Sequence, residues 1–311
     1  MIPFRTPVFC LLFVACSGAN TPSKDASDSG SDTDTSGGQG EDTGSTTGPL
    51  TETDYRNTGS YSVTTSSSSF SVGNGCTFDS SVFTPANAPE SATVILSHGF
   101  ARGKSNMEAW GTHLASWGIT VIAPDLCHAS PLDTNHEQNG VDLAGLSATL
   151  DANEVIYVGH SAGGLASVLA GSSDAKAKAV IGLDLTDASN SAVNASKNLQ
   201  VPYFGIAGEP SGCNSNGNGT AVVGQGGNFY GLRVVDADHC DFESPTDGLC
   251  TTFCANGSAR ISDEEIQATI RGLLTSAVIG SAGLDSNTVD QWWSGGVFHQ
   301  ELSSAGAIEA L

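Results

Sequence analysis

From about residue 55 onward, short and fully apolar runs alternate with segments of helical character. Segments 61–63 and 77–78 suggest edge strands. Runs rich in Val, Ile and Leu, which favour buried strands, lie at 92–96, 119–123, 154–158, 179–183, 203–206 and 231–235. Helices are predicted at 106–117, 141–150 and from 165, and a capping box at 262–265 begins another helix that runs to about residue 279. Apolar strands alternating with helices indicate an α/β fold, with a mostly parallel sheet covered on both faces.

The first 16 residues have the pattern of a secretory signal. Arg5 precedes an apolar run at 8–15, which is much shorter than the roughly 18–20 residues that span a bilayer. Phe13-Val14-Ala15-Cys16 resembles the end of a bacterial lipoprotein signal, so we expect cleavage before a lipidated Cys16. The alternative is an ordinary cleaved signal in which this cysteine is incidental.

Residues 17–54 form a tract of Ser, Thr, Asp and Gly with eight acids and one base, a net charge of −7. Its few apolar side chains cannot offset the entropy cost of ordering it, which predicts a flexible linker. The remainder, 55–311, shows no internal repeat and is expected to be one domain. It carries 25 acids and 9 bases, a net charge of −16. So acidic a chain is not expected to bind nucleic acid.

Cysteine usage agrees with export. Six cysteines follow Cys16, and an even number in an exported domain favours disulfides over free thiols or a metal site. They are Cys76, Cys127, Cys213, Cys240, Cys250 and Cys254, and the sequence leaves their pairing open. We expect a lipid-anchored protein of the bacterial cell envelope, with a secreted protein as the alternative.

One motif carries most of the candidate chemistry. Gly159-His160-Ser161-Ala162-Gly163 is a G-x-S-x-G sequence between a predicted strand and a predicted helix. In that context the small residues permit a sharp turn that exposes the serine, so Ser161 is predicted to be a nucleophile and the Ala162 N–H an oxyanion donor. The loop 97–100 follows an earlier strand and offers the Phe100 N–H as a second donor, with His98 expected to shape the loop.

A general base is expected after the last strand, where His239 lies. The acid that orients this histidine is less certain. Asp184 directly follows the run 179–183, whereas Glu209 follows the next strand. Position in the chain leaves both carboxylates open.

Taken together, these motifs resemble the α/β-hydrolase superfamily over about residues 55–280. Segments 97–100, 114–124 and 159–164 are similar to the chlorophyllase group, and also to bacterial polyester hydrolases and platelet-activating-factor acetylhydrolases. Segments 179–187 and 238–257 resemble chlorophyllase segments that carry the acid, the histidine and further cysteines. The resemblance implies Asp184 as the acid. The polyester hydrolases place it one strand later, which keeps Glu209 as the alternative.

The resemblance implies a serine-dependent carboxylic-ester hydrolase. We expect it to be a monomer and to need no metal or organic cofactor. Chlorophyllases usually have Arg where this chain has Ala162, so ester hydrolysis is carried over and chlorophyll as substrate is not. A neutral and apolar ester, small or polymeric, is expected. The alternatives are an inactive scaffold that binds at the cell surface, and a thioesterase or peptidase with the same triad.

Several apolar side chains are candidates for the substrate-binding mouth. They are Phe100 and Phe242, with Trp292 and Trp293 better explained as core residues. Residues 281–311 give no clear pattern, and either a last helix over the sheet or a mobile tail is compatible with them.

Overall fold

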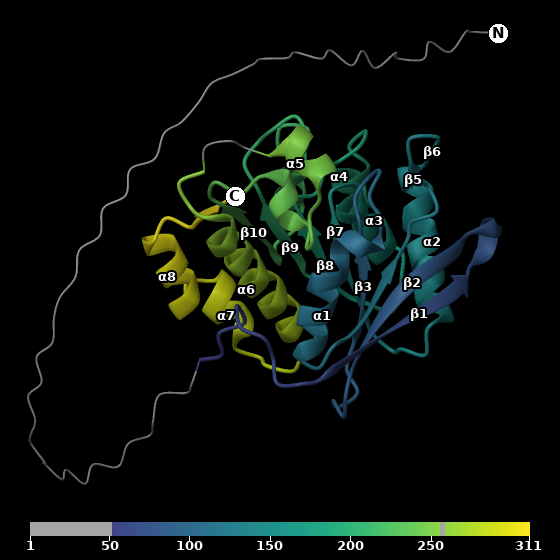
Figure 1. Ribbon diagram of the computed structural model, residues 1–311, viewed down its shortest axis with the longest axis horizontal. Helices are drawn as coiled ribbons and strands as arrows, with labels where there is room; N and C mark the ends of the chain where they lie inside the picture. The colour runs from purple at the N-terminus through teal and green to yellow at the C-terminus, as the bar shows by residue number, and fades with distance from the viewer. Residues whose placement is uncertain (1–51, 256–258) are drawn as a thin grey trace, which may run out of the picture. The chain divides into compact units, whose positions relative to one another are not determined.

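A computed structural model describes residues 52–255 and 259–311, which fold around a large, mostly parallel sheet (Figure 1). The predicted signal segment, Cys16 and the linker up to residue 51 lie outside the described residues. No helix in the described ranges is long and apolar enough to cross a membrane.

The main sheet has nine strands within these residues, in the order β1-β2-β4-β3-β7-β8-β9-β10-β11. Its six central strands are parallel: β4 (Thr120–Pro124), β3 (Thr93–Ser97), β7 (Val155–His160), β8 (Ala177–Leu183), β9 (Tyr203–Ala207) and β10 (Phe229–Val234). Antiparallel strands complete both edges: β1 (Val63–Ser71), β2 (Thr77–Pro85) and β11 (Ile308–Ala310). The prediction of a mostly parallel α/β sheet is confirmed.

Helices cover both faces of the sheet (Figure 1). One face packs against α1 (Glu108–Ser116), α6 (Asp263–Ser281), α7 (Thr288–Trp293) and α8 (Val297–Ser304). The other packs against α2 (His136–Thr149), α3 (Ala162–Gly171) and α4 (Ser191–Ser196). Neighbouring strand residues face opposite layers, so Leu96 lies in the first core and Ile95 in the second. This is why the central strands are apolar at most positions on both faces.

Short elements connect the layers and occupy the loops. They are the 3-10 helices η1 (Gly73–Gly75), η2 (Lys104–Met107), η3 (Asn218–Gln225) and η4 (His239–Phe242), the helix α5 (Gly248–Cys254), and the small hairpin of β5 (Ala129–Ser130) and β6 (Asp133–Thr134). The predicted capping box of α6 is present, because the Ser262 hydroxyl accepts from the Glu265 N–H and the Glu265 carboxylate accepts from the Ser262 N–H.

The C-terminal segment is folded onto the sheet rather than left as a tail. Trp292 and Trp293 are 0% and 5% exposed, so both are core residues, and Trp292 stacks on Phe298. Strand β11 pairs with the edge of β10 through backbone hydrogen bonds, which require no apolar pattern and therefore leave little trace in the sequence. The first strand, predicted near residues 61–63, extends to Ser71. Its many Ser and Thr side chains are exposed on an edge hairpin, so the sequence shows no apolar pattern that would mark its length.

All six expected cysteines are paired, which confirms the prediction of disulfides. Cys76 bonds to Cys127, Cys213 to Cys254, and Cys240 to Cys250. The second and third bonds both end in α5. This short helix is thereby tied to the loop after β9 and to the loop after β10.

Candidate active site

Ser161 lies alone in a sharp turn between the end of β7 and the start of α3. Its backbone has φ 55° and ψ −122°, a combination that is strained for any residue other than glycine. The turn is held by hydrogen bonds from the Ser161 N–H to the Leu183 carbonyl, 3.0 Å, and from the Gly164 N–H to the Ser161 carbonyl, also 3.0 Å. The strand, strained serine and helix have the form expected of a nucleophile turn.

Two glycines allow this turn to form. A Cβ atom on Gly159 would lie 2.2 Å from the Gly163 carbonyl oxygen, and one on Gly163 would lie 2.4 Å from the His98 carbonyl oxygen. Backbone meets backbone at both places, so a larger residue could not be accommodated by turning a side chain. The motif therefore brings α3 against both β7 and the loop after β3.

The structure brings His239 and Asp184 together. Their Nδ1 and Oδ2 atoms are 2.6 Å apart, and both side chains are buried. Asp184 follows β8, and its Oδ1 accepts from the Gly208 N–H at 3.0 Å and from the Asn214 amide at 3.2 Å. These donors fix the carboxylate. Since a carboxylate can only accept, the Nδ1 of a neutral His239 carries the proton and its Nε2 keeps the lone pair.

Within the described residues, no hydrogen bond or ion pair joins Glu209 to His239. Its carboxylate accepts from the Asp236 N–H at 3.2 Å, and its backbone carbonyl accepts from the Asn214 amide at 2.8 Å. Of the two candidate acids, only Asp184 is hydrogen-bonded to the histidine. Glu209 joins the loops after β9 and β10, which keeps Asn214 in place beneath Asp184.

The loop after β3 lies directly against Ser161. His98 Nε2 accepts from the Leu126 N–H at 2.9 Å, so its Nδ1 donates to the Gly99 carbonyl at 2.8 Å. Burial lowers the pKa of His98, in keeping with a neutral ring that shapes the loop. A Cβ on Gly99 would lie 3.0 Å from Ser161 Cβ, which shows how closely the segment before Phe100 approaches the serine. Ala162 is the first residue of α3, where a backbone N–H has no intrahelical acceptor.

Two polar residues at this site have no signal in the sequence. Thr186 Oγ1 lies 3.5 Å from Ser161 Oγ, and the Thr186 N–H donates to the Ser161 carbonyl at 3.3 Å. Asn214 donates to Asp184 from a loop that begins after β9. Neither belongs to a motif with fixed spacing, so only the fold reveals that they support the serine and the acid.

The expectation that Phe242 lines a substrate mouth is wrong. Its side chain is completely buried in the core between the sheet and α6, and its carbonyl accepts from the Trp110 indole at 3.0 Å. The short helix η4 turns this residue inward while His239 faces Asp184. Phe100, by contrast, is 40% exposed.

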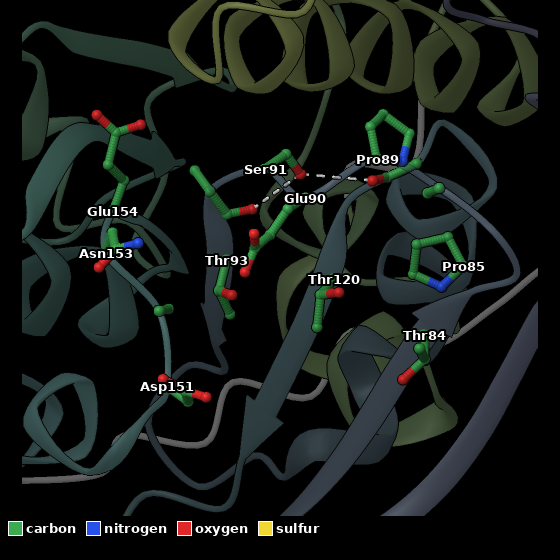
Figure 2. Close-up of a pocket in the computed structure, with 14 residues that line it drawn as sticks. Thr84, Pro85, Pro89, Glu90, Ser91, Thr93, Thr120, Asp151, Asn153 and Glu154 are labelled. Atoms are coloured by element: carbon green, nitrogen blue, oxygen red, sulfur yellow. Dashed lines mark hydrogen bonds between the residues drawn. The ribbon is translucent and has the colours of Figure 1, made fainter.

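A separate hollow of about 640 Å³ lies at the other end of the sheet (Figure 2). Its lining includes Thr93 and Thr120, the first residues of β3 and β4, whereas Ser161 follows the carboxyl end of β7. Glu90 and Glu154 also line it, without a histidine. Since ligands of parallel α/β sheets bind at the carboxyl ends of the strands, this hollow is not the candidate active site.

Comparison of the chain with models of known protein families gives no match, and comparison with curated proteins gives none either. The chemistry of the site therefore rests on the residues described above.

The carboxylate of Asp241, two residues after His239, is an unusual feature of the same loop. Its Oδ2 accepts from the Asp238 N–H at 2.7 Å as part of the cap of η4. Burial, together with the negative charges of Asp238 and Asp263, raises the pKa of Asp241 to about 7. The folded protein therefore holds a proton here between about pH 4 and pH 7, where the unfolded chain releases it.

Because the folded state binds more protons in that range, this group makes stability fall as the pH rises from 4 to 7. Asp241→Asn keeps an acceptor for the Asp238 N–H and removes the ionisation. We expect the melting temperature of Asp241→Asn minus that of wild type to be a few degrees larger at pH 8 than at pH 5. Thermal unfolding at both pH values tests this, with the exposed Asp151→Asn as the control. An Asp241→Asn curve parallel to that of wild type would contradict the assignment.

Proposed function

We propose that the protein is a serine-dependent carboxylic-ester hydrolase of the α/β-hydrolase type, with Ser161 as nucleophile, His239 as base and Asp184 as acid. The observation that carries the proposal is the 2.6 Å hydrogen bond between Asp184 and His239. This hydrogen bond and the strained turn of Ser161 both lie beyond the carboxyl ends of the parallel strands. Acyl transfer by a serine uses a histidine as base and a buried carboxylate that orients this histidine.

In the proposed reaction, His239 Nε2 takes the proton of the Ser161 hydroxyl while Ser161 Oγ attacks the ester carbonyl. Asp184 holds the ring and stabilises the imidazolium that forms. The N–H groups of Ala162 and Phe100 donate to the oxyanion. Collapse of the tetrahedral intermediate releases the alcohol, which takes the proton from His239. Water then attacks the acyl-enzyme with His239 again as base, and the acid leaves.

A neutral substrate with an apolar group fits the surroundings of the site. The net charge of −16 on residues 55–311 disfavours strongly anionic substrates. Phe100 is 40% exposed, and Leu249 and Phe253 on α5 are 55% and 64% exposed. Helix α5 is tied to the residue after His239 by the Cys240–Cys250 disulfide, so it belongs to the same loop as the proposed base. We propose that these side chains accept an acyl or aromatic group.

Turnover of p-nitrophenyl esters of increasing acyl length tests the reaction. The described domain from residue 52 should hydrolyse them, and Ser161→Ala should lower kcat by a factor of about 10³ or more. Ser167→Ala, a buried serine elsewhere on α3, is the control and should retain activity. Parallel assays with a thioester and a peptide amide separate the alternatives. Absence of wild-type turnover on every ester would favour the inactive surface-binding scaffold.

The assignment of the acid has its own test. Asp184→Asn should lower kcat by about 10³- to 10⁴-fold, because the amide no longer enforces the histidine tautomer that Ser161 needs. Glu209→Gln should stay within about tenfold of wild type, since that carboxylate braces loops at a distance from the ring. Steady-state kinetics of both variants decide the matter. Equal losses in the two would leave the choice of Asp184 without support.

We also propose that the protein is exported and held in the bacterial cell envelope by lipid on Cys16. Three disulfides support an oxidising compartment. Mass analysis of the mature protein should find an acylated N-terminal cysteine, and Cys16→Ser should release the protein from the membrane fraction. Cys10→Ser is the matched control, because that residue is removed with the signal. A mature terminus without lipid would point to the secreted form.

A further inference from the structure

A buried ion pair connects the two loops that carry the proposed oxyanion donor and the proposed base. Arg102 follows Phe100 by two residues, and Glu243 follows His239 by four. The Arg102 Nε and Nη2 atoms lie 2.5 and 2.6 Å from the two oxygens of Glu243. The side chains are 10% and 1% exposed, so this is a two-pronged pair largely removed from water.

Arg102 also reaches the far end of the histidine loop. Its Nη2 lies 3.0 Å from the Asp247 carboxylate, which caps α5 by accepting from the Leu249 and Cys250 N–H groups. Cys250 is bonded in turn to Cys240, the neighbour of His239. One guanidinium thus fixes both ends of the segment between the base and α5.

Two backbone hydrogen bonds also join η2 and α1, which follow the Phe100 loop, to the segment after His239. The Ala109 N–H donates to the Ser244 carbonyl at 2.8 Å, and the Ser244 N–H donates to the Asn106 carbonyl at the same distance. A buried charge pair costs desolvation energy and often stabilises a fold no better than apolar side chains of similar size. Its placement here therefore points to an electrostatic and geometric role.

His160 lies close to both Glu243 and His239. Its Nδ1 lies 3.7 Å from Glu243 Oε1, and its ring centroid is 4.5 Å from that of His239. Burial lowers the pKa of His160 well below its ordinary value, and the charge of Arg102 acts in the same direction, against the effect of a backbone hydrogen bond with His239. The groups that face the His160 ring are Glu243, Arg102, His239 and His98, and those that face His239 are Asp184 and His160.

We propose that Arg102 and Glu243 are positioning residues of the esterase, and the inference rests on that proposed function. Their ion pair holds the Phe100 loop and the His239 loop in register. It also neutralises the Glu243 carboxylate, so that the negative charge of this group does not favour a protonated His160 next to His239. Without Arg102, the negative charge of the carboxylate, 3.7 Å from His160, would favour the protonated form of the neighbouring imidazole.

Three variants test the proposal by the sign of their effect. Arg102→Gln leaves the carboxylate uncompensated, so the acid limb of the kcat/KM profile should move up by about one pH unit. Glu243→Gln leaves the Arg102 cation near the imidazoles of His160 and His239, so the acid limb should move to lower pH. Arg102 still pairs with Asp247 in this variant. The double variant should restore the wild-type limb. We expect kcat of Arg102→Gln to fall about 10- to 100-fold while KM stays within about threefold.

Controls separate this outcome from a loss of structure. Lys104 is a cation two residues after Arg102 that pairs with Asp79 and Asp125 instead of Glu243. Lys104→Gln should therefore leave the acid limb of the kcat/KM profile unchanged. Arg102→Lys keeps the charge without the two-pronged geometry, so it should lower kcat and keep the limb. If Arg102→Gln does not fold, Arg102→Lys with Glu243→Gln still carries the test. Shifts of the same sign in Arg102→Gln and Glu243→Gln, or none in either, would overturn the proposal.

Failure of the esterase proposal itself is recognised separately. Wild-type turnover that disappears in Ser161→Ala establishes the reaction, and unchanged profiles in the Arg102 variants then overturn only the role of the ion pair. If no ester is hydrolysed, NMR titration of the imidazole Cε1 protons reports both histidines directly. In this NMR titration, Arg102→Gln and Glu243→Gln should again give shifts of opposite sign. Absence of such shifts counts only against the proposed role of the ion pair.

Discussion

The close approach of α3 to the ends of β3 and β7 is the constraint on which the site depends. Gly159 and Gly163 have backbone within about 2.5 Å of where their Cβ atoms would be, and Ser161 takes a strained conformation between them. The same approach places the loop before Phe100 against the serine. A strained backbone of this kind persists only where its surroundings over-determine it, and here two layers of packed core do so.

Around that fixed turn, the remaining groups come from loops that need their own support. Asp184 is held by the Gly208 N–H and the Asn214 amide, and η4 presents His239 to it. The loops that carry Asn214 and His239 are both tied to α5 by disulfides. Packing thus sets the position of the serine, whereas hydrogen bonds, covalent links and a buried ion pair set the positions of its proposed partners.

The sequence predicted most of the architecture, because buried parallel strands are apolar on both faces and the small residues at 159–163 indicate a tight turn from strand to helix. It missed β11, a three-residue strand too short to show a period, and the full length of the polar hairpin of β1 and β2. Thr186 and Asn214 were missed because their contacts join residues far apart in no fixed register. Phe242 was misplaced because proximity to His239 in sequence does not fix which side of η4 faces the core.

The central claim is that Ser161 is a nucleophile activated by His239, which Asp184 orients. Labelling with a fluorophosphonate, followed by mass analysis of the peptides, tests it most directly because no natural substrate is needed. The account predicts a single phosphonate adduct on Ser161, formed much more slowly in Asp184→Asn and at a normal rate in Glu209→Gln. An unlabelled Ser161 in folded protein, or an adduct on another residue, would contradict it.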